Sequence, residues 1–287
     1  MNPTSPATPS APTATTAPEL LVDLAAIVAV SLAICVASQQ LLLMTIVVPA
    51  VWVLRTIAWA AVRPRARHAL GVELAFCLLA AAFGGFNDWM STNYYGIYDY
   101  TVPTDLPGIS TLPVWLLLYW GIILRFVATL ASYVGLGADP TPRDLVRLGR
   151  RRVHSPALKI ALQLAIVLAT RQAIFRLHLD PIWSWAPFLV AGGLHALLFP
   201  WDRRDLRIAL LALTIGTAVE VLYIQVGGLH RYHLGWIGGV PIWIALWWAL
   251  AMVIWRDLGL RILRRFVRWA QRAEPLARRL GTSPNHT

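Results

Sequence analysis

Long apolar runs are the feature that most constrains the fold of this chain. Several runs reach about 20 residues, the length of helix that crosses the hydrocarbon core of a bilayer. Lipid offers no partners to backbone N–H and C=O groups, so a crossing segment must be a helix or a strand of a closed barrel. The runs are continuous in Leu, Ala, Ile and Val, which favours helices. Only 14% of the 287 residues are charged, against about a quarter in a soluble domain. The sequence therefore predicts an all-α integral membrane protein.

The apolar runs predict eight transmembrane helices. Only Ser38, Gln39 and Gln40 separate the first two runs, so a single long helix with a re-entrant end is an alternative for residues 20–61. The expected helices cover residues 20–38, 41–61, 70–88, 112–134, 157–176, 182–200, 208–226 and 240–255.

The positively charged residues are concentrated in alternate loops between these runs. The formal net charge is +11, and 20 of the 25 basic residues lie after the second, fourth, sixth and eighth runs. This alternation is typical of cytoplasmic loops, and with eight spans it places both termini in the cytoplasm. The Ala/Arg-rich composition favours the cytoplasmic membrane of a bacterium. Because the loop charges are explained by topology, no nucleic-acid partner is predicted.

The two ends of the chain differ from its middle. Residues 1–18 are rich in Pro, Thr, Ser and Ala, which predicts a disordered tail. Residues 256–287 place Leu260, Leu263 and Phe266 at helical spacing among arginines. This pattern predicts a basic amphipathic helix bound to the anionic head groups of membrane lipids. A docking helix for a partner protein is the alternative.

An internal repeat relates the two halves of the chain. At a constant offset of 132 residues, acids, glycines and tyrosines fall in register, and the Pro-x-Trp stretch from Pro113 matches the one from Pro241 after a four-residue deletion. The repeat predicts two parallel four-helix units, at residues 19–138 and 157–255, joined by a basic cytoplasmic linker at 139–156. The matching pairs are Glu73 with Asp205, Asp88 with Glu220, Gly96 with Gly228 and Tyr100 with Tyr232.

The repeat points to one candidate catalytic pair, Asp88 and Glu220. Each ends an outward-running helix and is followed by a Gly/Tyr-rich loop. An ionisable group near membrane depth is costly and indicates a functional site. The structural alternative is an acid that caps its helix or pairs with an arginine.

Residues near this pair are candidates for substrate binding. Arg171 falls in the outer half of its helix, where it would keep the carboxylates ionised or position an anionic head group. Trp115 and Trp243 also suit the aromatic belt of a membrane protein. The candidate set is Asn87, Tyr98, Tyr100, Trp115, Arg171, Tyr232 and Trp243.

Other polar residues in the apolar runs receive structural interpretations. Arg55 is expected to extend toward the cytoplasmic face, and Arg125 to turn into the bundle. His195 is expected to be a packed, hydrogen-bonded histidine. Cys35 and Cys77 are expected to be buried, inert thiols.

Missing motifs limit the chemistry. The histidines are scattered, and no DDxxD, P-loop, HExxH, CxxC or nucleophile-elbow motif occurs. No metal and no other cofactor is predicted.

The loops also carry a family resemblance. Glu220 with GGLHRYHLGWIGGVPIWIALWW, and Asp88 with YYGIYDY, resemble membrane carotenoid-modifying proteins of the hydratase and small lycopene cyclase types. Trp115 and Trp243 stand near the positions where the cyclase type has paired glutamates, which argues against cyclisation. The resemblance implies an enzyme that acts on an isoprenoid or another apolar lipid.

Three functions are open at this point. The leading hypothesis is an enzyme that uses Asp88 and Glu220 as acid/base or cation-stabilising groups. A transporter or channel would need polar residues along a path through the bilayer, for which Gln163, Thr214 and Thr217 are candidates with Arg125 and His195. A non-catalytic membrane assembly factor would use the basic C-terminal helix as its contact.

Overall fold

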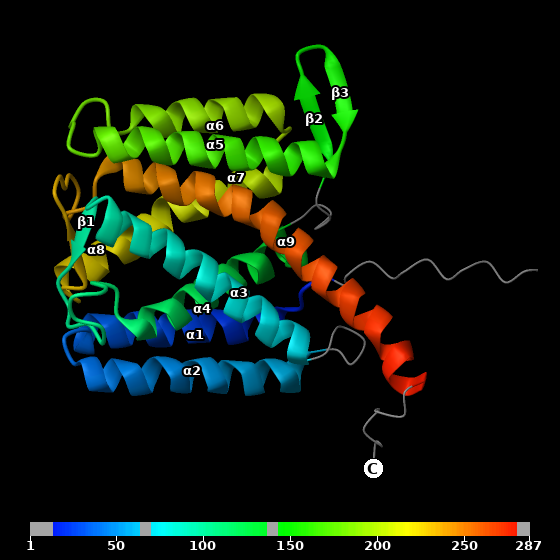
Figure 1. Cartoon of the computed structure of the whole chain (residues 1–287), viewed down its shortest axis with the longest axis horizontal. Coiled ribbons are helices and arrows are strands. Elements are labelled where there is room, and N and C mark those ends of the chain that lie inside the picture. Colours follow the sequence, from blue (N-terminus) through cyan, green and yellow to red (C-terminus); the bar gives the residue numbers. More distant parts are fainter. Residues whose placement is uncertain (1–13, 64–69, 137–142, 280–287) are drawn as a thin grey trace, which may run out of the picture.

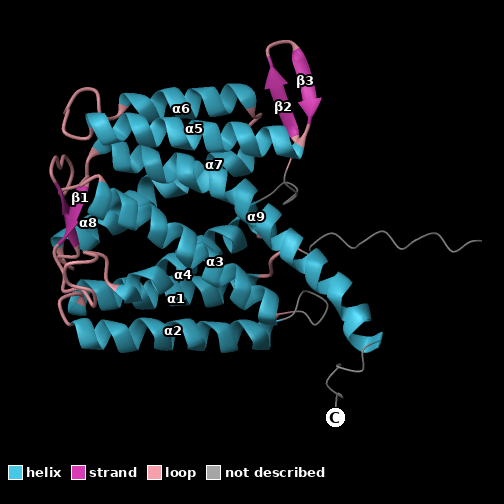
Figure 2. Ribbon diagram, viewed as in Figure 1, coloured by secondary structure: helices cyan, strands magenta, loops and turns pink. Residues whose placement is uncertain are grey.

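The structure, a computed structural model, describes residues 14–63, 70–136 and 143–279. Within these ranges, seven helices are long and apolar enough to cross a membrane. They run side by side between two ends, and the described chain begins and ends at the same one (Figure 1). A small sheet and loops gather at the opposite end (Figure 2). The chain is therefore a multi-pass helical membrane protein, as predicted.

The first helices confirm that residues 20–61 form two helices. Helix α1 covers Ala17–Ala37 and helix α2 covers Leu41–Val62. The N–H of Gln40 donates to the carbonyl of Ala37, which closes the turn between them. Thr16 and Glu19 form a capping box that starts α1, so this helix includes the last two residues of the predicted tail. The first part of that tail, residues 1–13, lies outside the described residues.

The next span ends in a loop that carries a short strand. Helix α3 covers Leu70–Trp89 and passes into a π-helical turn, η1, at Met90–Tyr94. Strand β1 follows at Tyr98–Tyr100, and helix α4 returns at Val114–Ser132 before a short 3₁₀ turn, η2, at Val134–Leu136.

A hairpin stands where the sequence predicts a basic linker. Strands β2, Leu145–Leu148, and β3, Arg151–His154, pair in antiparallel fashion. Helix α5 then covers Pro156–Leu177 and helix α6 covers Ala186–Leu198. With 13 residues, α6 is about 20 Å long, shorter than the roughly 30 Å of a hydrocarbon core. The predicted sixth span is thus a shorter helix that begins later than expected.

The last two spans complete the bundle. Helix α7, Arg203–Leu211, a π-helical turn η3, Ala212–Gly216, and helix α8, Thr217–Gln225, form one continuous span. Strand β4 covers His230–Tyr232, and helix α9 covers Ile242–Arg279. The sequence suggested a separate amphipathic helix and tail at residues 256–287, but residues 256–279 continue α9 without a break. Residues 280–287 lie outside the described residues. We call the end that carries β1 and β4 the loop end, and the end that carries β2 and β3 the hairpin end.

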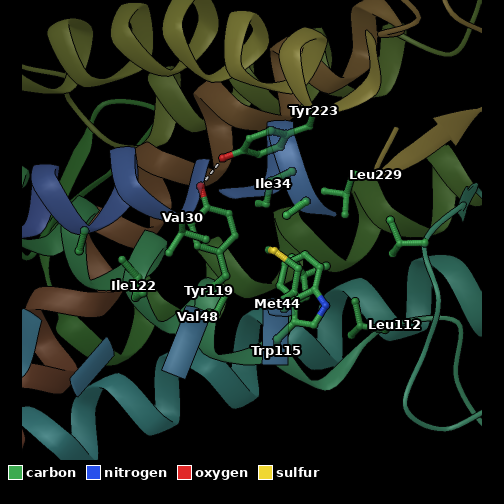
Figure 3. Packing of buried hydrophobic residues seen from close by; sticks show 14 residues of the cluster. Val30, Ile34, Met44, Val48, Leu112, Trp115, Tyr119, Ile122, Tyr223 and Leu229 are labelled. Carbon is green, nitrogen blue, oxygen red and sulfur yellow. Dashed lines mark hydrogen bonds between the residues drawn. The ribbon is translucent and has the colours of Figure 1, made fainter. Parts of the chain in front are cut away.

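The largest buried cluster joins both halves of the chain. Trp115 and Met44 pack against Val30 from neighbouring helices. At its edge the hydroxyls of Tyr119 on α4 and Tyr223 on α8 hydrogen-bond to each other (Figure 3). Ser31 on α1 lies within 2.6 Å of the Tyr223 hydroxyl. Apolar packing and a small hydroxyl cluster therefore hold α1, α4 and α8 together.

A buried ionic network links the first four helices. Arg55 of α2 binds Asp23 of α1 and Glu73 of α3, each at 2.6 Å. Arg125 of α4 binds Glu73 at 2.7 Å, and Thr129 donates to Asp23. The prediction for Arg125 is confirmed. The prediction for Arg55 is wrong, because two buried carboxylates hold its guanidinium inside the bundle, where it is 4% exposed.

Similar polar contacts occur in the later helices. The side chains of Gln163 on α5 and His195 on α6 approach within 3.3 Å, and Trp201 donates to the other nitrogen of His195. Arg256 of α9 binds Asp205 of α7. His195 is therefore a packed, hydrogen-bonded histidine, as predicted. Both cysteines are free. Cys77 is buried, as predicted, but the prediction of burial is wrong for Cys35, which is half-buried.

Candidate functional site

Two short strands bring the tyrosine-rich loops of the two halves together. Strands β1 and β4 pair antiparallel, with Tyr98 opposite Tyr232 and Tyr100 opposite His230. Alternate residues of a strand share a face, so the four rings lie on one face of this small sheet. The ring centroids of Tyr98 and Tyr232 are 5.1 Å apart, and those of Tyr100 and His230 are 5.8 Å apart. Asp99 and Arg231 alternate with these rings and lie 3.4 Å apart on the more exposed face.

Asp88 lies beneath this sheet, one residue before α3 ends. It is 1% exposed. Its carboxylate accepts hydrogen bonds from the hydroxyl of Tyr98, from the hydroxyl of Tyr100 at 2.6 Å and from Nε1 of Trp120 at 2.8 Å. Three donors from β1 and α4 therefore fix this carboxylate in place.

Glu220 of α8 occupies a similar place with fewer donors. The hydroxyl of Tyr232 donates to its Oε1 at 2.6 Å. Nε2 of His230 lies 3.2 Å from the same oxygen, but not at a hydrogen-bonding angle. Glu220 is thus held by one tyrosine and adjoined by one imidazole.

Both carboxylates line one cavity of about 60 Å³. A volume of roughly 10–15 Å³ of this kind accommodates one water molecule, so the cavity has room for a few waters or for one small functional group. Its walls are mainly aromatic and aliphatic. The lining residues are Asn87, Asp88, Ser91, Ile97, Tyr98, Trp120, Arg171, Ile174, Phe175, Phe188, Glu220, Tyr232, Trp243, Ile244, Trp247 and Trp248.

Arg171 lines the cavity without touching the acids. Its guanidinium donates to the backbone carbonyl of Asn87 at 3.4 Å and lies 5.2 Å from the ring centre of Phe175. In the described parts of the chain it forms no ion pair with Asp88 or Glu220. Arg171 was expected either to keep the carboxylates ionised or to position an anionic head group. It makes no contact that would support the first role, and the second role stays a prediction.

The two tryptophans of the Pro-x-Trp stretches have different surroundings. Trp243 lines the cavity, and its ring meets that of Tyr232 edge to face at 5.7 Å between centroids. Trp115 instead belongs to the apolar cluster around Met44 and Val30. The sequence placed Trp115 in the site because of the repeat, but α4 turns it away from the cavity.

His230, Trp120 and Trp248 are among the residues of this site that were not singled out from the sequence. His230 is 5% exposed, and both its ring nitrogens lack a hydrogen-bond partner among the described residues. Trp120 and Trp248 stack with 5.9 Å between centroids, yet only Trp120 finds an acceptor within the described chain. The sequence contained a signal that could have identified each of these three residues. His230 precedes Tyr232 by two residues, and the tryptophans end the matching Pro-x-Trp stretches.

The tyrosines act as hydrogen-bond donors in this arrangement. Burial, together with the adjacent Asp88 carboxylate, holds the pKa of Tyr100 well above its ordinary value. Burial and the charge of Glu220 do the same to the pKa of Tyr232. Both hydroxyls therefore keep their protons at neutral pH and donate hydrogen bonds to the carboxylates.

The arrangement allows proton transfer in an aromatic environment. Two carboxyls and an imidazole are groups that take up and release protons. Aromatic faces stabilise positive charge near them. A small cavity with this lining therefore suits a reaction in which a weakly polar group gains and loses protons.

Comparison with known proteins supports the fold. No family model matches the chain, and no curated protein matches it. Among solved structures, a cross-linked trimer of an arginine-to-cysteine variant of MvINS is similar, with 24% sequence identity and a TM-score of 0.51. The match covers 69% of this chain and 97% of that chain. The chain thus shares its helical architecture with a protein of known structure.

Proposed function

We propose that this chain is a membrane enzyme that modifies an apolar lipid or isoprenoid by acid/base chemistry. The observation that carries the proposal is the meeting of Asp88 and Glu220 in one aromatic-walled cavity. Each carboxylate comes from a different half of the chain and accepts a hydrogen bond from a tyrosine of the β1–β4 sheet. Isolated acids that only cap their helices would not need a shared cavity.

The proposed reaction is a proton-assisted isomerisation or addition. A carboxyl or imidazolium donates a proton to a carbon–carbon double bond, and the neighbouring carbon becomes electron-poor. The other member of the Glu220–His230 pair then removes a proton from the adjacent carbon, which shifts the double bond without a change in oxidation state. In the addition variant, water attacks the electron-poor carbon and loses its proton to the carboxylate. Trp120, Trp243 and Trp248 present faces that favour the cationic intermediate.

The two acids differ in a way that assigns their roles. The Asp88 carboxylate accepts three hydrogen bonds, which hold it in one orientation. We therefore assign it the role of stabilising positive charge on the substrate. Glu220 accepts from Tyr232 and adjoins His230. Within the described residues, the unpartnered nitrogens of His230 and Trp248 leave polar groups for a ligand or water. We assign proton transfer to Glu220 with His230, and the polar end of the substrate to Arg171.

Transport finds less support in the positions of its candidate residues. Thr214 and Thr217 donate to backbone carbonyls of their own span. Gln163 contacts His195, and Arg125 binds Glu73. Each of these groups finds its partner on its own helix or on a neighbouring one, so the candidates do not define a path through the bundle.

The proposed enzyme consists of two related halves, with eight helical passes if α6 is counted. Helices α1 and α5 bury the same positions 140 residues apart, from Glu19 and Lys159 at the start to Ile34 and Ile174 near the end. The Asp23–Arg55 pair and the Gln163–His195 pair fall at the same spacing. This correspondence supports common descent of the halves.

The proposal also includes orientation and location. With the arginine-rich loops in the cytoplasm, the hairpin end and both chain ends face the cytoplasm, and the site lies near the outer surface. The cytoplasmic membrane of a bacterium and a distant relation to carotenoid-modifying proteins remain part of the proposal.

The test is a lipid profile combined with an isotope label. The gene is deleted in its source organism and restored as wild type or as Asp88→Asn/Glu220→Gln, and extracted lipids and pigments are compared by mass spectrometry. We expect the double variant to accumulate a precursor that the wild type consumes. Purified protein incubated with that precursor in deuterated water should place deuterium in the product, as proton transfer to carbon requires.

Asp99→Asn is the matched control. Asp99 lies on β1 as well, but its side chain is 43% exposed and faces Arg231 on the opposite side of the sheet. This variant should retain the wild-type profile, and all variants should melt at similar temperatures in detergent. A double variant that restores the wild-type profile contradicts the proposal.

A further inference from the structure

We propose that the β2–β3 hairpin is a lateral anchor that binds the anionic head groups of the surrounding lipid leaflet. The inference rests on the membrane embedding of the helices and not on the enzymatic proposal. It therefore concerns a surface far from the cavity, at the other end of the bundle (Figure 1).

The first observation is a set of arginines without acidic partners. Arg147, Arg150, Arg151 and Arg152 are all exposed. Within the described ranges, none of the four forms an ion pair with a carboxylate. Arginines in neighbouring segments are used differently, since Arg143 binds Asp202 at 3.1 Å and Arg261 binds Asp144 at 2.6 Å. The hairpin thus concentrates uncompensated positive charge.

The second observation is the register of the strands. Arg147 lies directly opposite Arg152, and Leu148 lies opposite Arg151. Like charges in directly opposed positions destabilise a strand pair. An anion that bridges the two guanidiniums would turn this unfavourable pair into a binding site, because arginine forks bind phosphate groups well.

The third observation is that the base of the hairpin is held firmly. Val146 is fully buried in a cluster with Phe199 and Ile254. The N–H of Ser155 donates to the carbonyl of Asp144, and Nζ of Lys159 donates to the carbonyl of Arg143. The direction of the hairpin is therefore fixed by α5, α6 and α9.

That direction identifies the partner. The strands run across the helix axes, and the tip extends sideways past α6 at the level where the helices end (Figure 1). A segment in this position lies over the neighbouring lipid. Leu148, 42% exposed beside the tip, shares its face of the hairpin with Arg151, and Arg147 and Arg152 project from the other face. Leu148 can enter the apolar boundary while the long arginine side chains extend to the head groups around it, as in interfacial segments. Each arginine at an anionic surface strengthens such binding by about fivefold.

The experiment places an environment-sensitive fluorophore at the tip. The dye is attached through Leu148→Cys in a background of Cys35→Ala and Cys77→Ala, and the full chain is reconstituted into nanodiscs. We expect a blue shift and quenching by lipid-attached quenchers in phosphatidylglycerol discs. The signal should be weak in phosphatidylcholine discs and should decrease with salt.

Charge variants separate this site from the rest of the basic surface. Arg147→Gln/Arg151→Gln/Arg152→Gln should abolish the anion-dependent shift, as expected from a loss of about fivefold per arginine. Arg265→Gln/Arg268→Gln/Arg272→Gln removes the same charge from α9 and should retain the shift. The proposal is overturned if the shift is equal in both lipids or survives the hairpin substitutions. It is also overturned if an oligonucleotide or an acidic polypeptide produces the shift and anionic lipid does not.

Discussion

At the scale of single residues, the site combines predictable and unpredictable members. Asp88 and Glu220, like Tyr100 and Tyr232, were selected because they match across the repeat, and they lie together in the structure. His230 could not be selected in the same way, because the position that matches it in the first half carries a different residue type, Tyr98. Trp115 shows the opposite error, since a matching position does not guarantee a matching environment.

His230 is the residue whose substitution should separate chemistry from stability. Neither ring nitrogen makes a hydrogen bond to the described residues, and His230→Phe keeps an aromatic ring in this buried place. The substitution should therefore cost about 1 kcal/mol of stability, the typical effect of a single substitution. Loss of a general acid or base lowers turnover by about a hundredfold to ten-thousandfold. The checks are the melting temperature in detergent and the incorporation of deuterium into the product. A variant with normal turnover would remove His230 from the proposed mechanism.

Tyr100 and Tyr232 should make the fold sensitive to alkali. Their pKa values lie well above the ordinary value in the folded chain, whereas an unfolded tyrosine ionises at about pH 10. The folded state therefore binds these protons more tightly, so their contribution to stability is constant below about pH 10 and is lost as the pH rises beyond it. Tyr100→Phe/Tyr232→Phe should show a shallower decline in melting temperature between neutral and strongly alkaline pH. Equal slopes in the two proteins would contradict this account.

At the scale of elements, the sequence predicts most of the membrane-spanning helices. It does not predict which distant segments pair with one another or where one helix continues into the next segment. Apolar length identifies the spans, because a bilayer demands it. Nothing in the local pattern indicates that β1 pairs with β4, since that pairing joins segments that lie 132 residues apart, as Tyr100 and Tyr232 do. The continuation of α9 beyond the bundle is also hidden, because its apolar and arginine-rich parts look like two helices. The position of Arg55 depended on Asp23, a residue on another helix.

The close approach of α3 to α4 provides a prediction at this scale. A Cβ on Gly84 would lie 2.8 Å from Cβ of Trp120, the residue that binds Asp88. Gly84→Ala should therefore displace α4 and cost about 1–3 kcal/mol of stability. Gly71→Ala on the same helix meets nothing within 4 Å and should be neutral or slightly stabilising. Thermal melts of both variants in detergent decide the matter, and equal melting temperatures would argue against a packing role for Gly84.

At the scale of the whole molecule, the halves are joined at both ends. The β1–β4 sheet joins them at the loop end. Toward the hairpin end, Arg204 of α7 donates to the carbonyls of Ala131 and Tyr133, and Nε1 of Trp255 donates to the carbonyl of Leu124. Both sets of contacts oppose a movement of one half against the other, which an alternating-access transport cycle would require.

The ionic network inside the first half should be sensitive to the loss of one of its members. Arg55 neutralises Asp23 and Glu73 inside the bundle, so Arg55→Met leaves two buried carboxylates with less compensation and should cost about 3–5 kcal/mol. Adding Asp23→Leu removes one of these acids, so the double variant should lose less stability than the sum of the two single variants. Arg176→Met, at an exposed position of α5, is the control and should melt like the wild type. Unfolding in mixed detergent measures each variant against the wild type. Strictly additive losses would contradict the pairing of Arg55 with Asp23, whereas the predicted deficit would show that this pair couples α1 to α2.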